Sequence, residues 1–295
     1  MKKADLNDSM KIGIIGSGKV GISIGHVMKD KGLHVAGVSD KFESQLNVAR
    51  NYMGNGLHYT HDNMEIVQSS DVIAITTQDR AITEVAGEIY EKSERLDGKL
   101  FFHTSGAHPA SILSSLEAKG AFSGSLHPLQ TFPDIESAIR VIPDTYIFIE
   151  GHEEAIPVLT LIGRTIGFDV VRIEGKNKVL YHLTAVYVCN LLCALLYAGQ
   201  DIMNKAGVEL QPFFPIIKAT LKNIESKGPL MSLTGPVIRG DAETVSSHLQ
   251  AMEGLELYTK VYKALSSVAL DMVRKRGVLD NEILEKLQGI LEDAG

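Results

Sequence analysis

The chain has 295 residues, which at about 150 residues per domain suggests two domains. Apolar residues make up 44% and charged residues 22%, as in an ordinary globular protein, which excludes a disordered or collagen-like chain. The net charge of −7 and the lack of a long Lys/Arg block argue against a nucleic-acid partner.

Two features at the level of the whole chain favour a cytoplasmic protein. The polar tail Met1–Met10 lacks the apolar core of a signal peptide, and Met10, directly before the first predicted strand, is a candidate natural start. Cys189 and Cys193 are too few for a disulfide framework, and their apolar neighbours predict two reduced thiols in a helix core. Reduced thiols are typical of the cytosol.

Short β-rich runs alternate with helical stretches in the first half of the chain. The predicted strands are 11–16, 33–38, 71–76, 99–103, 121–126, 145–150 and 168–173. Helical candidates between them include 19–31, 81–91 and 155–166. Near-continuous apolar strands separated by helices are typical of a parallel sheet covered on both faces. We therefore expect an α/β domain with a doubly wound sheet over residues 10–174.

The second half, residues 175–295, predicts an all-α domain, because no further convincing strand follows Gly175. The stretch 179–199 carries no Asp, Glu, Lys or Arg and is long enough to span a bilayer. Its polar residues and the lack of a second such stretch favour a helix buried inside the helical domain, without a membrane. Two Gly-Pro pairs within 227–241 predict a break between helices, after which Asp241 can cap the next one.

A glycine fingerprint follows the first predicted strand. Gly16, Gly18 and Gly21 have the spacing G-x-G-x-x-G. The first glycine permits the tight turn, the second lets a pyrophosphate approach the backbone, and the third lets helix and strand pack closely. The residues between them, Ser17, Lys19 and Val20, open a helix whose free N–H groups would face the phosphates. The position of this motif predicts dinucleotide binding, and a glycine-rich structural turn is the alternative.

The residues after the second strand bear on the choice of coenzyme. Asp40 would bond the ribose 2′-hydroxyl of NAD, whereas Ser39 and Lys41 would suit the 2′-phosphate of NADP. The choice between NAD and NADP therefore stays open, with a slight preference for NADP. A flavin is a weaker alternative, because no second cofactor-binding segment is evident.

Polar residues at the ends of later strands are candidates for the substrate pocket, because ligands bind at the carboxyl ends of such strands. Thr76, Thr77 and Gln78 follow one strand and would border the cofactor. Ser105 and Gly106 follow the next strand. His127 ends another, and a hydrogen-bonded structural role is the alternative for this histidine.

The start of the helical half offers a proton donor. Lys178 and His182 are four residues apart and would share a helix face. Reduction of a carbonyl or imine by hydride needs such a donor. Asn190 would line the same pocket from one side, about 80° around the helix. The alternative is a solvated lysine and a structural histidine. The histidines lack metal-ligand spacing, so we expect no metal.

Four motifs together resemble one family. They are His103–Ala107, His127–Phe132, Tyr181–His182 and Leu233–Asp241. The chain is similar to proteins that pair a Rossmann-like domain with a C-terminal domain of unknown function, number 2520. That family is similar in turn to the 6-phosphogluconate dehydrogenase and ketopantoate reductase-like group.

This resemblance implies a helical domain that forms a homodimer, with the active site in the cleft between the two domains. Lys178 matches the proton-donating lysine of the β-hydroxyacid dehydrogenases, and His182 stands where those enzymes have an asparagine. Ser105 corresponds to a serine that binds substrate. The ketopantoate reductases make a branched 2-oxo acid the best single substrate.

The residues and the resemblance lead to one main hypothesis, an NAD(P)H-dependent reductase of a small 2-oxo acid or imine. The second hypothesis is a non-catalytic dinucleotide-binding sensor or scaffold protein. A third is hydride exchange between a nicotinamide and a deazaflavin coenzyme.

Overall fold

The computed structural model describes residues 10–293, so the polar tail before Met10 lies outside the described residues. The chain divides into two compact units, of which the first ends at Val188 and the second begins at Cys189. This division falls inside a long helical run, Gly175–Asn204.

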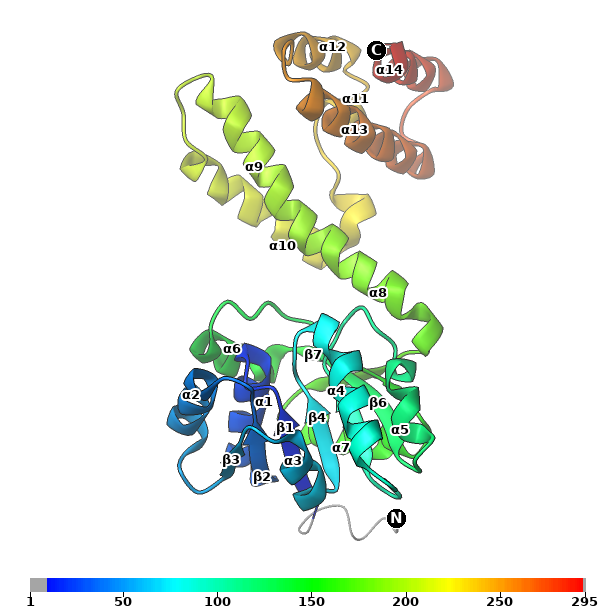
Figure 1. Ribbon diagram of the computed structural model, residues 1–295. Coiled ribbons are helices and arrows are strands. Elements are labelled where there is room, and N and C mark those ends of the chain that lie inside the picture. The colour runs from blue at the N-terminus through cyan, green and yellow to red at the C-terminus, as the bar shows by residue number, and fades with distance from the viewer. Residues whose placement is uncertain (1–9, 294–295) are drawn as a thin grey trace. The chain divides into compact units, whose positions relative to one another are not determined.

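An eight-stranded sheet forms the centre of the first unit, in the order β3-β2-β1-β4-β5-β6-β7-β8 (Figure 1). Its strands are β1 (Lys11–Ile15), β2 (His34–Ser39), β3 (His58–Thr60), β4 (Val72–Ile75), β5 (Leu100–His103), β6 (Phe122–Pro128), β7 (Tyr146–Gly151) and β8 (Asp169–Arg172). Strand β3 is not predicted from the sequence, because its three exposed or half-buried residues show no alternation of apolar and polar side chains.

The predicted parallel sheet is confirmed except at one pair, because β7 runs antiparallel to β6. Pro128 at the end of β6 pairs with Ile147 at the start of β7. The segment between these strands therefore leaves and re-enters the sheet at the same edge. Such a return reverses the strand direction, whereas a helix that crosses the sheet would preserve it.

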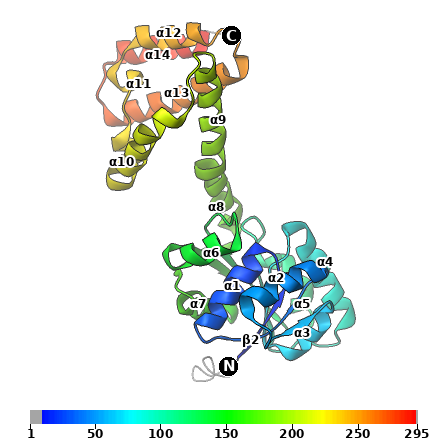
Figure 2. The same cartoon turned by 90° about the vertical axis from the view of Figure 1, so that its left-hand side faces the viewer.

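Helices cover both faces of the sheet, as Figures 1 and 2 show. They are α1 (Lys19–Asp30), α2 (Glu43–Met53), α3 (Asn63–Ser69), α4 (Asp79–Lys92), α5 (Ser114–Glu117), α6 (Ile135–Val141) and α7 (Ala155–Thr165). A further helix, α8 (Lys178–Ala185), follows β8 along the chain and covers neither face. Successive strand residues point to opposite faces. Phe102 accordingly joins the core under α1, α2 and α7, and Phe101 joins the core under α3 and α4. The predicted doubly wound Rossmann-like unit is thus confirmed.

The second unit contains no strand among its described residues, as predicted. Its helices are α9 (Leu191–Asn204), α10 (Phe214–Ser232), α11 (Pro236–Arg239), α12 (Ala242–Ala251), α13 (Glu256–Arg276) and α14 (Asn281–Asp293). Val245, Val273 and Leu287 are fully buried and join α12, α13 and α14 in one core. The predicted break begins at Gly228, where φ is +75°, and Asp241 caps α12 by accepting a hydrogen bond from the Thr244 N–H.

The predicted burial of 179–199 is wrong for the single chain. Val179, Leu180 and Tyr197 are 66%, 64% and 64% exposed. Cys189 and Cys193 are free thiols, as predicted, but they are exposed and not in a core. The run Gly175–Asn204 is long and apolar enough to cross a membrane by length and composition, and none of its most apolar window is buried. The prediction failed because apolar composition is the same for a helix that its own chain buries and for a helix whose exposed surface binds another molecule.

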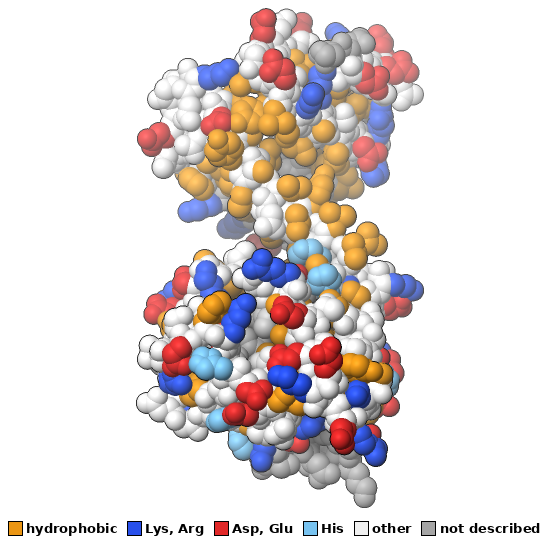
Figure 3. All heavy atoms as spheres, viewed as in Figure 1, with side chains coloured by type: hydrophobic (Ala, Val, Ile, Leu, Met, Phe, Trp, Pro, Cys, Tyr) orange, Lys and Arg blue, Asp and Glu red, His pale blue; other side chains and the backbone are white. Residues whose placement is uncertain are grey.

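Hydrophobic side chains also gather on the face of the second unit that Figure 3 shows. The exposed apolar residues of α9 and α10 form what we call the α9–α10 surface, which comprises Leu191, Leu195, Tyr197, Ile202, Phe214, Ile216, Leu221, Leu230 and Met231. Exposed apolar patches of this kind are typical of interaction sites.

Candidate active site

The glycine fingerprint forms the turn between β1 and α1. Gly16 has a φ of +98°, which favours glycine, and a Cβ there would lie 2.9 Å from the backbone nitrogen of Thr77. A Cβ on Gly21 would overlap the carbonyl oxygen of Gly16. By contrast, a Cβ on Gly18 would meet no heavy atom within 4 Å, so this glycine borders open space. Two of the glycines are therefore needed for packing, and the middle one leaves room for a ligand.

The start of α1 has the properties of an anion site. Gly18 caps the helix without a side chain, and the first turn holds no acidic residue, so no side chain of α1 itself offsets the positive end of the helix dipole. The Thr77 hydroxyl beside this turn is buried and has no hydrogen-bond partner among the described residues. Thr76, by contrast, donates to the Gly16 carbonyl at 2.5 Å and fixes the turn. These residues fit the pyrophosphate of a dinucleotide.

The three residues predicted to select the coenzyme, Ser39, Asp40 and Lys41, make different contacts. The Asp40 carboxylate accepts hydrogen bonds from the N–H and the hydroxyl of Ser17, at 2.7 and 3.0 Å. Ser39 is buried and donates to the side chain of Asn63 at 2.8 Å. Lys41 is exposed, with its ammonium 5.0 Å from the centre of the Phe42 ring. Asp40 is therefore the one that contacts the fingerprint turn.

Three further predicted residues belong to the starts of α4 and α1. Gln78 is the N-cap residue of α4, three residues after the end of β4. Lys19 donates to the carbonyl of Pro133 at 2.6 Å and so ties α1 to the segment after β6. Val20, in the first turn of α1, packs against the core below it.

Two histidine rings converge on Gly106. A Cβ built on this glycine would lie 2.7 Å from Nε2 of His127 and 2.9 Å from Nδ1 of His182. The ring centres of the two histidines are 6.5 Å apart. His182 Nδ1 is buried and has no hydrogen-bond partner among the described residues. The structure thus brings together three predicted residues, which come from the segment after β5, from β6 and from α8.

Tyr181 completes this group. Its hydroxyl is 2.6 Å from Nδ1 of His127, and its ring packs against Phe148 of β7 with centres 4.2 Å apart. Burial lowers the pKa of His127 to about 4, with a smaller contribution from the charge of Lys178. Burial also raises the pKa of the Tyr181 phenol well above its ordinary value. At neutral pH both groups are therefore uncharged.

His103 and Ser105 hold the segment after β5 in place. His103 Nδ1 accepts a hydrogen bond from the Ser105 N–H, and its Nε2 donates to the Pro109 carbonyl, each at 3.2 Å. Burial lowers the pKa of His103 to about 3, so the ring is neutral. The Ser105 oxygen accepts hydrogen bonds from the N–H groups of Ala107 and His108. These contacts fix the backbone that carries Gly106.

Lys178 lies beneath the histidines. Its side chain is 1% exposed, donates to the hydroxyl of Ser125, and has its Nζ 3.5 Å from a carboxylate oxygen of Glu150. Burial lowers the pKa of Lys178 to about 8, and the Glu150 charge opposes that shift. The sequence does not predict Ser125 and Glu150 as site residues, because they become neighbours only through the antiparallel pairing of β6 with β7.

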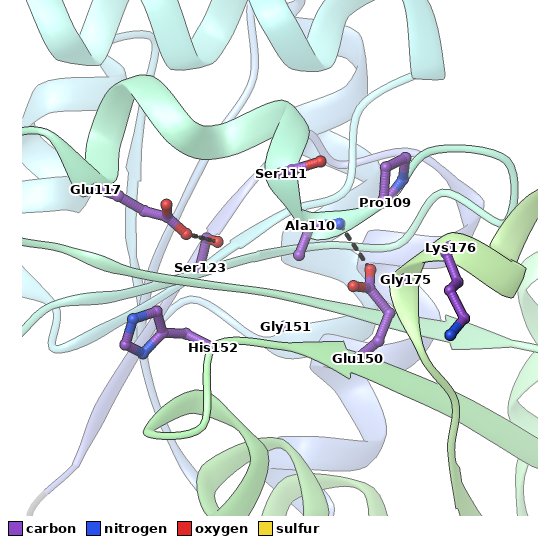
Figure 4. Close-up of a pocket in the computed structure, with 10 residues that line it drawn as sticks. All are labelled: Pro109, Ala110, Ser111, Glu117, Ser123, Glu150, Gly151, His152, Gly175 and Lys176. Carbon is purple, nitrogen blue, oxygen red and sulfur yellow. Dashed lines mark hydrogen bonds between the residues drawn. The ribbon is translucent and has the colours of Figure 1, made fainter.

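Glu150 also borders a cavity of about 430 Å³ (Figure 4). It is lined by Pro109, Ala110, Ser111, Glu117, Ser123, Glu150, Gly151, His152, Gly175 and Lys176. In it Glu150 accepts a hydrogen bond from the Ala110 N–H at 2.6 Å, and Ser123 donates to Glu117. None of the predicted site residues lines this cavity.

Asn190 belongs to the second unit, at the last residue of the π-helix Val186–Asn190, where it is exposed. Its part in substrate binding stays a prediction. Among the residues that the structure describes, no group of three or more His, Cys, Asp or Glu side chains is arranged to hold a metal ion.

Two family models match the chain. A Rossmann-like domain matches residues 2–128, and the domain of unknown function DUF2520 matches residues 145–269. No curated protein matches the chain.

Solved structures share the fold over nearly the whole chain. A Bacteroides fragilis protein proposed to be an NADP oxidoreductase is 22% identical with a TM-score of 0.71, covering 88% of this chain and 98% of its own. A Thermotoga maritima protein is 22% identical with a TM-score of 0.72, over 90% of this chain and 99% of its own. A reductive aminase from Aspergillus terreus, solved with NADPH4, cyclohexanone and allyl amine, is 17% identical with a TM-score of 0.62, over 97% and 93%. The chain thus contains a Rossmann-like domain that is followed by a DUF2520 domain.

Proposed function

We propose that this protein is an NAD(P)H-dependent oxidoreductase that reduces the C=O or C=N bond of a small substrate. The observation that carries the proposal is the convergence of two histidine nitrogens on Gly106, in the unit that holds the open glycine turn. A reductase needs both a dinucleotide site and a proton donor. The similar structures from Bacteroides fragilis and Aspergillus terreus, one proposed to be an NADP oxidoreductase and one solved with NADPH4, support the same reading.

Separate residues bind the coenzyme and supply the proton. The turn Gly16–Gly18 and the start of α1 bind the pyrophosphate, and a bound reduced nicotinamide supplies the hydride. His182, whose Nδ1 has no partner among the described residues, delivers the proton to the substrate heteroatom. His127 hydrogen-bonds the same atom. Lys178 is the other candidate for the proton donor, but its ammonium donates to Ser125 and pairs with the carboxylate of Glu150. We therefore favour His182.

A branched 2-oxo acid of the ketopantoate type is the finer proposal for the substrate, and it rests on the resemblance to the ketopantoate reductases. A panel of 2-oxo acids and imines, followed by the absorbance of the reduced nicotinamide, tests the reaction. We expect His182→Ala to lower kcat about 100-fold on the best substrate. His34→Ala, an exposed histidine at the start of β2, is the matched control. Tight NAD(P)H binding without turnover of any substrate would instead indicate the sensor or scaffold.

We expect the coenzyme preference to depend on Asp40. Its carboxylate contacts the fingerprint turn and would lie near the 2′ position of the ribose, where it repels a 2′-phosphate. Asp40→Ser should therefore raise the ratio of NADPH to NADH affinity about tenfold, which corresponds to about 1.4 kcal/mol.

Isothermal titration of NADPH and NADH into the parent protein and into Asp40→Ser measures this ratio. A general loosening of the turn would weaken the binding of both coenzymes equally and would leave the ratio unchanged. Asp62→Ser is the control, because Asp62 caps α3 and contacts no residue of the fingerprint turn. An unchanged ratio would show that the carboxylate does not face the ribose.

We also propose that the α9–α10 surface binds a second copy of the chain. The surface is apolar and exposed in the single chain, and the second copy carries an identical surface that a symmetric dimer buries. Sedimentation velocity should then give twice the chain mass of 32.1 kDa, and Leu195→Glu should give the single mass. A monomer that needs detergent to stay in solution would indicate a membrane instead.

A further inference from the structure

The hydroxyl of Tyr181 is held against His127 by packing on both sides. Its ring stacks on Phe148 with centres 4.2 Å apart and meets the His127 ring edge-on at 5.6 Å. The hydroxyl oxygen lies 2.6 Å from Nδ1. Strand β7 therefore sets the position of the phenol, and the phenol in turn contacts one defined nitrogen of the imidazole.

The direction of this hydrogen bond follows from the charge states together with the donor strengths of the two groups. The raised pKa of Tyr181 keeps the phenol protonated, and the lowered pKa of His127, about 4, keeps the imidazole neutral. A neutral imidazole has one N–H and one acceptor nitrogen. A phenol is a stronger hydrogen-bond donor and a weaker acceptor than a neutral imidazole. The phenol O–H therefore donates to Nδ1 of His127, and the single ring proton resides on Nε2.

That Nε2–H points at the space beside Gly106. A Cβ there would be 2.7 Å from His127 Nε2 and 2.9 Å from the unpartnered Nδ1 of His182. A substrate atom seated against this glycine would thus face a fixed N–H from one ring and a nitrogen of the other that can donate or accept.

We propose that Tyr181 is a positioning residue that fixes His127 as an Nε2–H donor, and that the site therefore takes a carbonyl oxygen and not an iminium nitrogen. This inference rests on the proposed reductase function and narrows it. A carbonyl oxygen has two lone pairs, which accept one hydrogen bond from each histidine. An iminium nitrogen has no lone pair, and its own N–H would face the N–H of His127.

The reduction balances with these two donors. When hydride adds to the carbonyl carbon, the π electron pair moves to the oxygen. The oxygen then takes the Nδ1 proton of protonated His182, which leaves an alcohol and a neutral imidazole. His127 keeps its proton and stabilises the developing negative charge.

The tautomer is measured directly by the side-chain ¹⁵N shifts of histidine-labelled protein at pH 7, with His127→Gln used to assign the signals. We expect His127 to show a protonated Nε2 and an unprotonated Nδ1, and Tyr181→Phe to give a mixture of both tautomers. Phenylalanine keeps the ring packing against Phe148, and the exposed Tyr146 provides the control Tyr146→Phe. A protonated Nδ1 in the parent protein, or an unchanged tautomer in Tyr181→Phe, would overturn the proposal.

A second arm compares 3-methyl-2-oxobutanoate with 2-methyl-1-pyrroline, which is protonated to the iminium. We expect the oxo acid to be the better substrate, and Tyr181→Phe to lower its kcat/KM about tenfold, less than the roughly hundredfold loss of an entire oxyanion donor. Faster reduction of the pyrroline would overturn the carbonyl assignment while leaving the reductase function in place. If neither compound is reduced, the substrate panel decides the reductase function, and the tautomer measurement still decides the role of Tyr181.

Discussion

Gly106→Ala is expected to lower kcat/KM at least 100-fold while the protein stays folded. The added methyl group would sit 2.7 Å from Nε2 of His127 and 2.9 Å from Nδ1 of His182, closer than carbon and nitrogen atoms approach without a bond. At least one ring must then move. The loss of a single donor to a developing oxyanion already costs about 100-fold in kcat, and the methyl group disturbs two.

The backbone itself accepts this substitution. Gly106 is not among the glycines with positive φ, so alanine can adopt the same conformation. The expected destabilisation is about 1–3 kcal/mol, the usual cost of an overpacked side chain. Loss of activity in a folded protein would therefore report on the two ring nitrogens.

Gly124→Ala is the matched control. Its methyl group would lie 2.6 Å from a methyl carbon of Leu159, on the sheet face that α7 covers. It introduces similar strain in β6, away from the histidines. The thermal unfolding temperature and the kcat/KM are measured for both variants. We expect both variants to lose stability, and Gly106→Ala alone to lose most of its activity. Full activity in Gly106→Ala would show that the substrate does not reach this glycine.

The sequence predicts the dinucleotide turn well because every requirement of that turn is local. Gly16 needs a positive φ, Gly21 needs close helix packing, and both follow from one strand–turn–helix segment. The alternation of strands and helices likewise predicts the layers of the sheet, since each apolar strand must be covered on both faces.

The polar group beneath the site depends on pairing over long sequence distances. Ser125 lies opposite both His103 of β5 and Glu150 of β7, and Lys178 reaches this row from a helix beyond the sheet. Nothing local distinguishes Glu150 from an exposed glutamate at a strand end. The residues that contact Glu150 depend on the antiparallel pairing of β6 with β7, and the hydrophobic pattern of the sequence does not predict that pairing. Because these contacts are not predicted, the sequence alone indicates that Lys178 is free to donate a proton.

Glu150→Gln is expected to destabilise the protein by about 3–4 kcal/mol at pH 5, because it leaves the ammonium of Lys178 buried without an opposite charge. At this pH the release of a proton with a pKa of about 8 would itself cost about 4 kcal/mol, so the lysine cannot relieve the loss cheaply. The two side chains are 1% and 7% exposed, so water cannot replace the carboxylate. Glutamine keeps an oxygen that can accept from the Ala110 N–H. The substitution therefore changes the charge and preserves the shape.

The double variant Glu150→Gln with Lys178→Met tests this explanation. Removing both charges should restore much of the lost stability, because a methionine has no charge to desolvate. Chemical denaturation followed by far-UV circular dichroism measures the change, since the chain has no tryptophan. The exposed pair Lys275 and Asp271 supplies the control Asp271→Asn, for which we expect a loss of less than about 1 kcal/mol. Equal losses for Glu150→Gln and Asp271→Asn would contradict a buried charge pair.

The lysine also makes stability depend on pH in a defined direction. Burial lowers the pKa of Lys178 from 10.5 to about 8, against the opposing effect of Glu150. Between these values the unfolded chain holds a proton that the folded chain has released, so the free energy of unfolding rises with pH. Below pH 8 both states hold the proton, and the full cost of burying the charge is present. Relative to Lys178→Met, the parent protein should therefore gain up to about 3 kcal/mol from pH 8 to 10.5, at about 1.4 kcal/mol per pKa unit. A flat difference over this range would mean that the lysine stays charged when folded.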